Sequence, residues 1–428
     1  MVSSYPLGEL VVREPDYGSG ERAIPIQNTD DVKYIRITDF DDDGIVPGNE
    51  FATAENIEER YRLVDSDVLF ARSGATAGKT FIYSSRIGPS IFAGYCIRFR
   101  FDKQRALPAF IYFYTKTSRY QAWVRSIQRP SGQPNINKEE FKSFTVPLPI
   151  PSVQEEMVGK MERAQESRQC KLNDADALLS GLDEFLLDRL GLTVPESDNR
   201  IAFAIHVNQA SNERFDPHFH HPNFCHLMTQ IQRKPNKPLG DIIDFSTEQR
   251  DPANLPGETF KYIEISGVNR YTGEITVSNI ATSEAPSRAR MLVREGDIIV
   301  SLTRPHHGSI AFIDAKFDNC IASTGFAVIH EYKDITLLTH YLLAVLRSSL
   351  SLQQMLQRSS GGNYPAITEG ELKRILIPIP AENIQREIVR ELLNRRLEAS
   401  RLREEAAQEW NSAKARFEAQ LLGNEVTR

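Results

Sequence analysis

The sequence has little cysteine, no long apolar run and no secretion signal. Its four cysteines, Cys96, Cys170, Cys225 and Cys320, are scattered and form no C-x-x-C pair. That spacing argues against a disulfide framework and against a thiolate zinc site, and it favours a reducing cytoplasm. No stretch of about 18 apolar residues could form a transmembrane helix, and the N-terminus lacks the charged and apolar regions of a signal peptide. We therefore expect a cytoplasmic protein with no membrane role.

Recognisable catalytic motifs are also missing. The chain contains no G-x-G-x-x-G, no G-x-S-x-G and no Asn-Pro-Pro-aromatic tetrapeptide. Residues 74–80, GATAGKT, resemble a phosphate-binding loop, but the spacing is one residue short and a strand is expected next, so we favour a strand–turn–strand. Asp16 and Asp31 superficially match a nuclease signature that is short and common by chance. The sequence thus predicts no catalytic site in this chain.

One stretch is rich in possible metal ligands. Residues 218–226 contain four histidines and Cys225, and zinc binds such side chains. However, Pro217 and Pro222 would break a helix that could bring them together, and the paired spacing of zinc fingers is absent. A surface or linker role is the favoured interpretation, with a metal site as the alternative.

The overall composition is that of a globular protein, but its charge is unevenly distributed. The 428 residues are 40% hydrophobic and 25% charged, which suggests two or three domains. The net charge of −6 argues against a general nucleic-acid binder. Residues 1–70 carry 6 Lys and Arg against 16 Asp and Glu, whereas residues 71–145 carry 13 against 3. Either the two stretches pair within one domain, or the second forms a basic face.

The chain repeats itself once. Five motifs recur in the same order: residues 6–10 as 238–242, 33–37 as 261–265, 67–70 as 297–300, 146–149 as 377–380 and 154–158 as 385–389. The offsets are 232, 228, 230, 231 and 231, so the sequence predicts a tandem duplication with a period of about 230 residues. Copy one begins part-way into the repeat unit. This is expected if the two repeats are arranged in a ring and the ends of the chain lie inside one of them.

Both copies follow the same internal order. Short apolar or alternating runs bounded by Gly, Pro and Asn predict strands. An aromatic segment follows, at 109–127 and 337–356, and is expected to be helical. A polar loop, RPSGQPNI or SSGGNYPAI, leads to a proline-rich exit and then to a long helix.

The two long helices are the clearest elements. Ser152 with Glu155 predicts a capping box, and apolar residues then recur at steps of three, four or seven until Gly191. The second helix follows the same pattern up to Gly423. A helix of about 38 residues is roughly 57 Å long and outreaches a single core. We therefore predict a mixed α/β fold in which an antiparallel two-helix coiled coil separates two domains; the alternative is that each helix packs only on its own domain.

These features resemble the specificity (S) subunits of Type I restriction–modification systems. The resemblance covers nearly the whole chain and rests on the duplication, the proline-rich exits, Gln154 and Gln385 opening the helices, and the phrase DVLFARSG at 67–74. Residues 214–217, RFDP, look like the beginning of a recognition domain in that family. Copy two departs from the pattern by having Arg304-Pro-His-His-Gly in place of the Arg-Ser-Gly turn, and copy one lacks the Arg-Phe-Asp-Pro motif.

The resemblance implies a non-catalytic subunit with two target recognition domains, each reading one half of an asymmetric bipartite site in double-stranded DNA. It implies domains at 1–150 and 193–380, the latter including a linker, and conserved helices at 151–192 and 381–423 that dock two methyltransferase (M) subunits. S-adenosylmethionine, ATP and Mg would be bound by partners, including restriction motor-nuclease (R) subunits, and not by this chain.

The residues expected to contact DNA are polar or basic and lie in matching loops. They are Arg72, Ser73, Lys79, Arg129, Ser131, Gln133 and Asn135 in copy one, and Arg304, His306, His307, Ser360, Asn363 and Tyr364 in copy two. The residues expected to bind partner subunits are Gln154, Met157, Gln385 and Ile388. Two alternatives remain: a specificity subunit of a methyltransferase-only or other phage-defence complex, and a coiled-coil scaffold without DNA binding.

Overall fold

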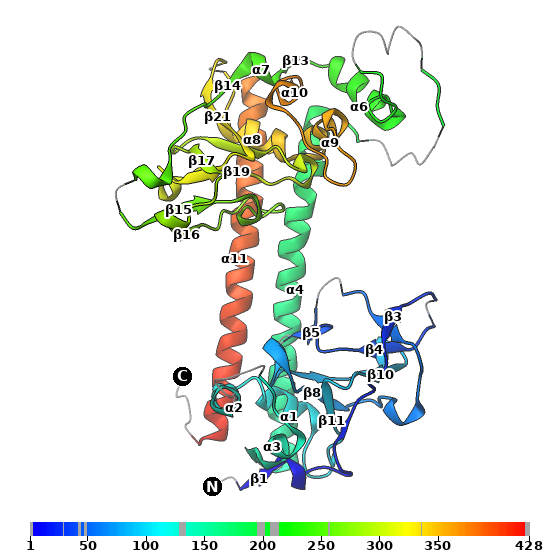
Figure 1. The fold of residues 1–428 in the computed structure, drawn as a ribbon. Helices are drawn as coiled ribbons and strands as arrows, with labels where there is room; N and C mark the ends of the chain where they lie inside the picture. Colours follow the sequence, from blue (N-terminus) through cyan, green and yellow to red (C-terminus); the bar gives the residue numbers. More distant parts are fainter. Residues whose placement is uncertain are drawn as a thin grey trace. The chain divides into compact units, whose positions relative to one another are not determined.

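The computed structural model contains two compact units that do not follow the linear order of the chain. Its described residues are 3–28, 30–41, 44–46, 49–127, 134–194, 202–205, 214–255, 257–334 and 336–423. The first unit comprises residues 1–174 and 401–428, and the second comprises residues 175–400 (Figure 1). Each unit therefore combines a domain with parts of both long helices.

The first unit is built on two four-stranded sheets. One sheet is antiparallel, in the order β2 (Asp16–Tyr17), β11 (Cys96–Phe99), β8 (Val68–Ala71) and β9 (Thr80–Ile82). The other has the order β10 (Ser90–Phe92), β4 (Lys33–Ile35), β7 (Ala52–Ala54) and β3 (Ala23–Pro25), with β10 parallel to β4. Two-stranded ladders join β1 (Ser4–Pro6) to β12 (Thr145–Pro147) and β5 (Phe40–Asp41) to β6 (Gly44–Ile45). Every residue of β8 is buried, as its unbroken apolar run predicts.

The predicted aromatic helix of the first unit is interrupted. It is divided into α1 (Pro108–Tyr114) and α2 (Ser118–Ile127), and a short α3 (Lys138–Ser143) follows. The hydroxyls of Thr115 and Thr117 donate to the carbonyls of Tyr112 and Tyr114 at 2.6 and 2.7 Å. These side chains satisfy carbonyl groups at the end of α1, which allows the chain to turn there.

The second unit repeats this plan. Its antiparallel sheet has the order β14 (Ile243–Phe245), β21 (Phe326–Tyr332), β18 (Ile298–Ser301) and β19 (Ile310–Phe312). Its mixed sheet has the order β16 (Ser278–Ala281), β15 (Thr259–Ile263), β20 (Ile321–Ser323) and β17 (Ala289–Leu292), with β15 parallel to β20. A two-stranded ladder joins β13 (Asn236–Pro238) to β22 (Leu376–Pro378). The antiparallel sheets share one strand order and both mixed sheets contain one parallel pair, which confirms the duplication that the sequence predicts.

The helices of the second unit follow the first, except that α6 has no counterpart among the described residues there and α7 stands where the first unit has a 3-10 turn. They are α6 (Pro222–Gln232), α7 (Leu239–Ile242), α8 (Thr339–Arg347), α9 (Ser349–Arg358) and α10 (Glu369–Leu372). As in the first unit, the predicted aromatic helix is divided in two, here at Ser348, whose hydroxyl donates to the carbonyl of Val345 at 2.6 Å. Short 3-10 turns connect the strands: η1 (Leu7–Glu9), η2 (Glu59–Tyr61), η3 (Gly74–Thr76), η4 (Ser85–Ile87), η5 (Pro252–Asn254), η6 (Ile265–Gly267), η7 (Thr282–Glu284), η8 (Pro305–His307) and η9 (Ala315–Phe317).

The long helices are α4 (Pro151–Leu190) and α11 (Glu382–Leu421), each of 40 residues. Because α4 begins at Pro151, the expected N-cap Ser152 instead lies inside the first turn. Proline suits this first position, since its missing N–H would have no partner within the helix. No helix among the described residues is long and apolar enough to cross a membrane.

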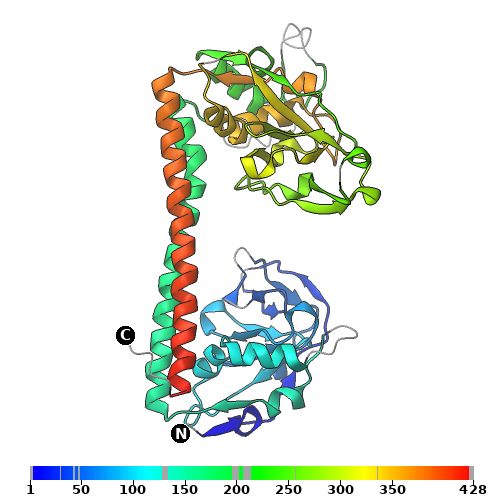
Figure 2. The ribbon, with the colours of Figure 1, turned by 90° about the vertical axis from the view of Figure 1, so that its left-hand side faces the viewer.

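The two long helices pair antiparallel, as predicted. In the first unit, Lys171 of α4 forms ion pairs with Glu405, at 3.4 Å, and with Glu409. In the second unit, the guanidinium of Arg395 donates to the carbonyl of Gly181 at 3.1 Å. Later residues of α4 thus meet earlier residues of α11, and the helices lie side by side in each unit (Figure 2).

The helices also pack on the domains, but each packs on the domain of the other repeat as well as on its own, so the alternative interpretation is wrong. In the first unit, the ring of Phe417 of α11 packs at a tilt against Phe110 of α1, with 5.4 Å between ring centres, and shares one core with Met157 of α4. The hydroxyl of Ser118, at the start of α2, donates to the carboxylate of Glu418 at 2.8 Å. The core of the first unit is therefore completed by a helix from the other repeat.

The second unit is completed in the same way by α4. Leu186 and Leu187 of α4 share the core of α8 and α9. The hydroxyl of Ser349, at the start of α9, donates to the carboxylate of Asp183 at 2.6 Å. The end of each repeat's long helix thus packs in the domain of the other repeat, where its acidic residue bonds the start of a helix.

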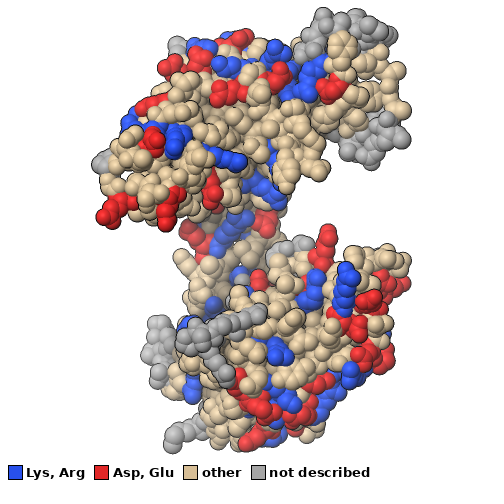
Figure 3. Space-filling view, viewed as in Figure 1, with Lys and Arg blue, Asp and Glu red and all other residues tan. Residues whose placement is uncertain are grey.

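Much of the opposite charge in the first unit is paired internally. Arg98 is buried and bonds Asp16 at 2.6 Å, and Arg100 bonds the buried Asp67 at 2.7 Å. Lys142 pairs with Glu14 at 3.0 Å. In the view of Figure 3, acidic and basic side chains are intermixed over the surface of both units. The pairing interpretation of the charge segregation is therefore supported for these groups.

Candidate nucleic-acid interface

The turn after β8 is attached to the loop that follows α2. Ser73 forms a strand bridge with Asn135, and the amide of Gly74 donates to the carbonyl of Pro134 at 2.9 Å. The amide of Ile136 donates to the carbonyl of Arg72 at 2.8 Å. These bonds bring together two of the predicted loops, although they are more than 60 residues apart in the sequence.

The side chains at this junction form a small exposed surface. The guanidinium of Arg72 lies 4.8 Å from the ring centre of Tyr17, and its Nε donates to Oδ1 of Asn135 at 3.4 Å. Asn135 is exposed, Arg72 and Lys79 are half-buried, and Ser73 is almost fully buried. Arg72 and Asn135 are thus available for contact with a ligand, whereas the Ser73 side chain contributes little surface. Arg129, Ser131 and Gln133 lie outside the described residues.

Residues 74–80 form the strand–turn–strand that was predicted in place of a phosphate-binding loop. The 3-10 turn η3 joins β8 directly to β9, and no helix follows it. Gly78 has a φ of +90°, and a Cβ there would lie 2.6 Å from Val124. Glycine is therefore required at this position by backbone conformation and by close packing.

The matching turn in the second unit has the same backbone bonds. Thr303 forms a strand bridge with Ala366. The amide of Arg304 donates to the carbonyl of Pro365 at 2.7 Å, and the amide of Ile367 donates to the carbonyl of Leu302 at 2.9 Å. By these bonds, Leu302 corresponds to Arg72 and Arg304 corresponds to Gly74. The repeat offset of 230 residues gives the same match of Arg304 to Gly74, so the arginine of the second-unit turn is not equivalent to Arg72.

Arg304 adopts a backbone conformation that glycine has in copy one. Its φ is +47°, and that of Gly74 is +69°. A non-glycine residue in the left-handed region costs of order 1 kcal/mol or more. Its guanidinium lies 4.3 Å from the ring centre of Tyr364, which is 71% exposed, and also donates to the carbonyl of Asn363 at 3.3 Å. Four predicted contact residues, namely Arg304, Ser360, Asn363 and Tyr364, are thus brought to one junction.

The two histidines of η8 differ in their surroundings. His306 is half-buried, and its Nδ1 has no hydrogen-bond partner in the described structure. Burial lowers the pKa of His306, and the neighbouring His307 and Arg304 lower it further. His307 is exposed. At neutral pH, His306 is therefore uncharged, while His307 faces solvent.

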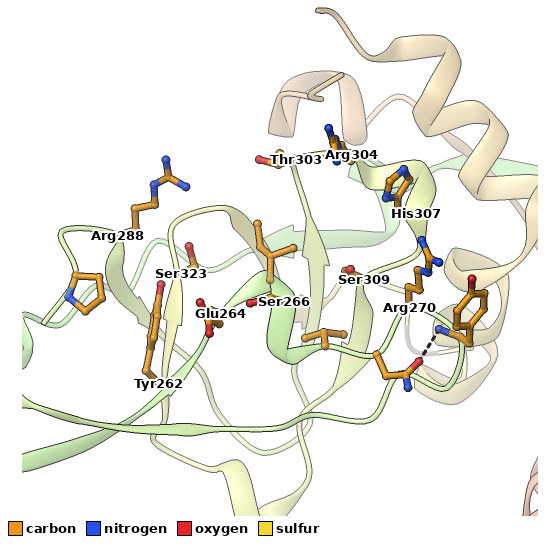
Figure 4. Close-up of a pocket in the computed structure, with 15 residues that line it drawn as sticks. Tyr262, Glu264, Ser266, Arg270, Arg288, Thr303, Arg304, His307, Ser309 and Ser323 are labelled. Atoms are coloured by element: carbon orange, nitrogen blue, oxygen red, sulfur yellow. Dashed lines mark hydrogen bonds between the residues drawn. The ribbon is translucent and has the colours of Figure 1, made fainter. Parts of the chain in front are cut away.

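A groove of about 830 Å³ runs beside this turn (Figure 4). Its lining includes Arg270, Arg288 and Arg304 together with His307 and the exposed Tyr271. Three guanidinium groups and exposed aromatic rings are suited to a polyanion with stacked bases. We call this cavity the second-unit groove.

Sequence reasoning missed much of this groove. It did not select Arg270 or Arg288, and it also missed Tyr17 in the first unit. The Arg-Tyr pair at 270–271 lies in a short loop before Gly273, a pattern that could have suggested a binding loop. Arg288 carries no such signal, because only strand pairing brings it to the groove.

The predicted partner-binding residues are buried in their own units. Oε1 of Gln154 accepts from the amide of Leu107 at 2.8 Å, and its Nε2 donates to the carbonyl of Pro149 at 2.8 Å. Gln385 makes the corresponding bonds to Leu338 and Pro380 at 3.1 and 3.0 Å.

Met157 and Ile388 are likewise buried, each in the core of its unit. None of the four predicted residues, Gln154, Met157, Gln385 and Ile388, therefore has surface to offer a partner. They hold the long helices to the domains, and the expectation of direct partner contact is corrected.

The other candidate motifs are held by structural contacts in the part of the chain that the structure describes. No group of three or more His, Cys, Asp or Glu in the described part of the chain could hold a metal ion. His220 is buried, and His221 caps α6. Asp16 is bonded to Arg98, and Asp31 accepts the amides of its own turn. The histidine-rich stretch therefore has a structural place in the second unit.

Comparisons with known proteins agree with this architecture. Residues 19–171 and 234–398 match the family model described as Type I restriction modification DNA specificity domain. The chain is 30% identical over 114 residues to the Type I restriction enzyme HindI specificity subunit of Haemophilus influenzae, and 27% identical over 142 residues to the StySPI specificity subunit of Salmonella potsdam. These alignments cover 26% and 32% of this chain, and 24% and 31% of those proteins.

A solved structure supports the fold over the whole chain. It is described as "Structural basis underlying complex assembly and conformational transition of the type I R-M system", and it covers 99% of this chain and 98% of its own at a TM-score of 0.56. At 17% identity this likeness concerns the fold alone. The two family matches, one in each repeat, span most of the chain. The protein therefore belongs to the Type I restriction modification DNA specificity family.

Proposed function

We propose that this chain is the DNA specificity subunit of a Type I restriction–modification complex, and that each unit reads one half of a bipartite site. The observation that carries the proposal is one turn framework with two different sets of side chains. Where copy one has Arg72 and Gly74, copy two has Leu302 and Arg304 in the same backbone bonds. The two units share this backbone arrangement but carry different side chains on it, which favours recognition of two different half-sites in the DNA.

The charge distribution supports binding to double-stranded DNA at defined places. A net charge of −6 gives no general attraction to a polyanion. The second-unit groove nevertheless gathers three arginines, which can neutralise phosphates, beside the exposed Tyr271 and polar groups. Polar side chains such as Asn135 can bond base edges in the major groove.

The chain supplies a surface for partner subunits as well. Leu393 and Leu397 of α11 are one turn apart, and they are 43% and 69% exposed. Exposed apolar side chains on one helix face favour docking of another protein. We propose that methyltransferase (M) subunits bind the long helices. S-adenosylmethionine, ATP and Mg are then bound by M and R subunits in a cytoplasmic complex, and this chain performs no chemistry itself.

Methylation-sensitive long-read sequencing of host DNA, with and without this gene, tests the proposal. The expected result is a bipartite motif of methylated adenines that disappears when the gene is deleted. An unchanged methylome together with no salt-dependent binding of duplex DNA by the assembled complex would instead favour the scaffold alternative. A methylated motif without restriction of unmodified phage DNA would favour a methyltransferase-only complex.

A further inference from the structure

The second-unit groove contains one acidic side chain among its arginines. Glu264 is the only carboxylate among the described residues that line the groove. Its side chain is exposed, and its carboxylate forms no hydrogen bond or ion pair in the part of the chain that the structure describes. Figure 4 shows Glu264 beside Ser266 and Ser323 inside the groove.

The sheet topology holds Glu264 in this position. It follows directly after β15 and precedes η6, where its carbonyl accepts from the amide of Gly267 at 3.0 Å. Because β15 and β20 are parallel neighbours, their carboxyl ends meet at the same edge, which brings Ser323 close to Glu264. The backbone around Glu264 is thus fixed by bonding, while its side chain remains free.

Two of the three arginines that line the groove are held against tyrosine rings, and none of the three forms an ion pair with Glu264 in the part of the chain that the structure describes. The guanidinium of Arg304 stacks on Tyr364 at 4.3 Å, and that of Arg270 stacks on Tyr271 at 4.6 Å. A surface glutamate with only a solubilising role would gain by pairing with such cations. This groove keeps both kinds of charge exposed and separate.

The equivalent position in copy one holds a residue of opposite charge, whose side chain is bound within its own domain. Arg36 corresponds to Glu264 in the recurring motif, and its guanidinium bonds both oxygens of Asp39 at 2.7 and 3.1 Å. Asp39 is fully buried, so Arg36 is held against its own domain. Copy two therefore exposes a carboxylate at a position where copy one has a side chain bonded within its own domain.

An unpaired carboxylate at a DNA interface is unfavourable unless it accepts a hydrogen bond from a donor group on a base. Phosphates would repel it, whereas the exocyclic amino group of cytosine in the major groove donates to a carboxylate. We infer that Glu264 reads the N4 amino group of a cytosine in the half-site bound by the second unit, while the surrounding arginines contact phosphates. This inference rests on the proposed function, and it assigns one base preference to one residue.

The test uses the assembled complex and a randomised duplex DNA library. The wild type, Glu264→Gln and Glu264→Ala are compared by the base frequencies of the selected sequences. Glu295→Gln is the matched control, because it removes the same charge from an exposed residue before β18, at the end of that strand away from the groove. We expect a cytosine at one position of one half-site to be preferred by about 10- to 100-fold. That preference should be lost in Glu264→Ala and shifted toward adenine in Glu264→Gln.

The possible results separate this inference from the proposed function. If the wild type selects a bipartite motif and both Glu264 variants select the same bases, the inference is overturned. Tighter binding of Glu264→Ala with unchanged base frequencies also overturns it, because the carboxylate would then only repel phosphates. If the wild-type complex selects no motif, the proposed function itself fails.

Discussion

Replacing Phe417 by alanine should loosen the first unit, although this residue lies more than 240 positions after the strands of that domain. Phe417 is only 4% exposed, and its ring packs on Phe110 in a core shared with β8 and β11. Removing a buried phenylalanine leaves a cavity in addition to the lost transfer free energy. We expect the free energy of unfolding of the first unit to fall by about 3–5 kcal/mol.

Hydrogen exchange of the full chain measures this loss locally. A decrease of that size corresponds to amide exchange that is about 10²- to 10⁴-fold faster where exchange requires opening of the whole unit. The amides of β8 and β11 should show it, and those of β18 and β21 in the second unit should not. The melting temperature of the first unit, a body of roughly 200 residues, should fall by about 10 °C.

Two variants serve as controls. Phe215→Ala removes the same side chain from an 81% exposed site and should leave exchange in both units unchanged. Leu186→Ala should accelerate exchange at β18 and β21, because Leu186 of α4 lies in the core of the second unit. If Phe417→Ala leaves exchange of β8 and β11 unaltered, α11 does not complete the first core, and the reasoning from shared packing is refuted.

Three further predictions follow from the described residues. Arg72→Ala should weaken duplex DNA binding by the assembled complex by about 1–3 kcal/mol in a fluorescence anisotropy titration, and unchanged affinity with unchanged site preference would contradict its role. Lys237 holds the pKa of Asp334 at about 2, so Asp334→Asn should lower stability at pH 7 by less than about 1 kcal/mol, because solvent screens the pair at its exposed Lys237 end. Asp334 ionises more readily in the folded state, so this loss should disappear in denaturation curves as pH falls through about 2. Removing one heptad from both long helices, within 164–178 and 399–413, shortens each helix by roughly 10 Å. Methylome sequencing should then show the two half-sites about three base pairs closer together. An unchanged distance between the half-sites would mean that partner subunits set that distance.

Local patterns predicted the elements that depend on neighbouring residues. The apolar stripe of α4 and α11, the buried run of β8 and the strand–turn–strand at 74–80 are each readable from a few consecutive residues. Even here, the N-cap predicted at Ser152 is two residues late, because α4 already begins at Pro151, a residue that is also common at helix starts.

Residue identity alone does not show that Arg304 and Gly74 adopt the same backbone conformation. Backbone hydrogen bonds match Leu302 to Arg72 and Arg304 to Gly74. Arg304 and Gly74 share a left-handed backbone, which the letters do not reveal because arginine rarely adopts it. Similarly, Gln154 looks like a surface residue of a first helical turn, and only its bonds to Leu107 and Pro149 explain its burial.

The sequence by itself determined the duplication, the long helices, the mixed α/β class and the resemblance to specificity subunits, because each depends on composition or on order along the chain. Only the tertiary structure decided how α4 and α11 exchange ends between the domains, and which side chains surround the second-unit groove. That groove joins residues from β15, from the 269–271 loop and from the turn after β18. Strand pairing between distant segments brings them together, and no local pattern encodes which distant strand a segment will meet.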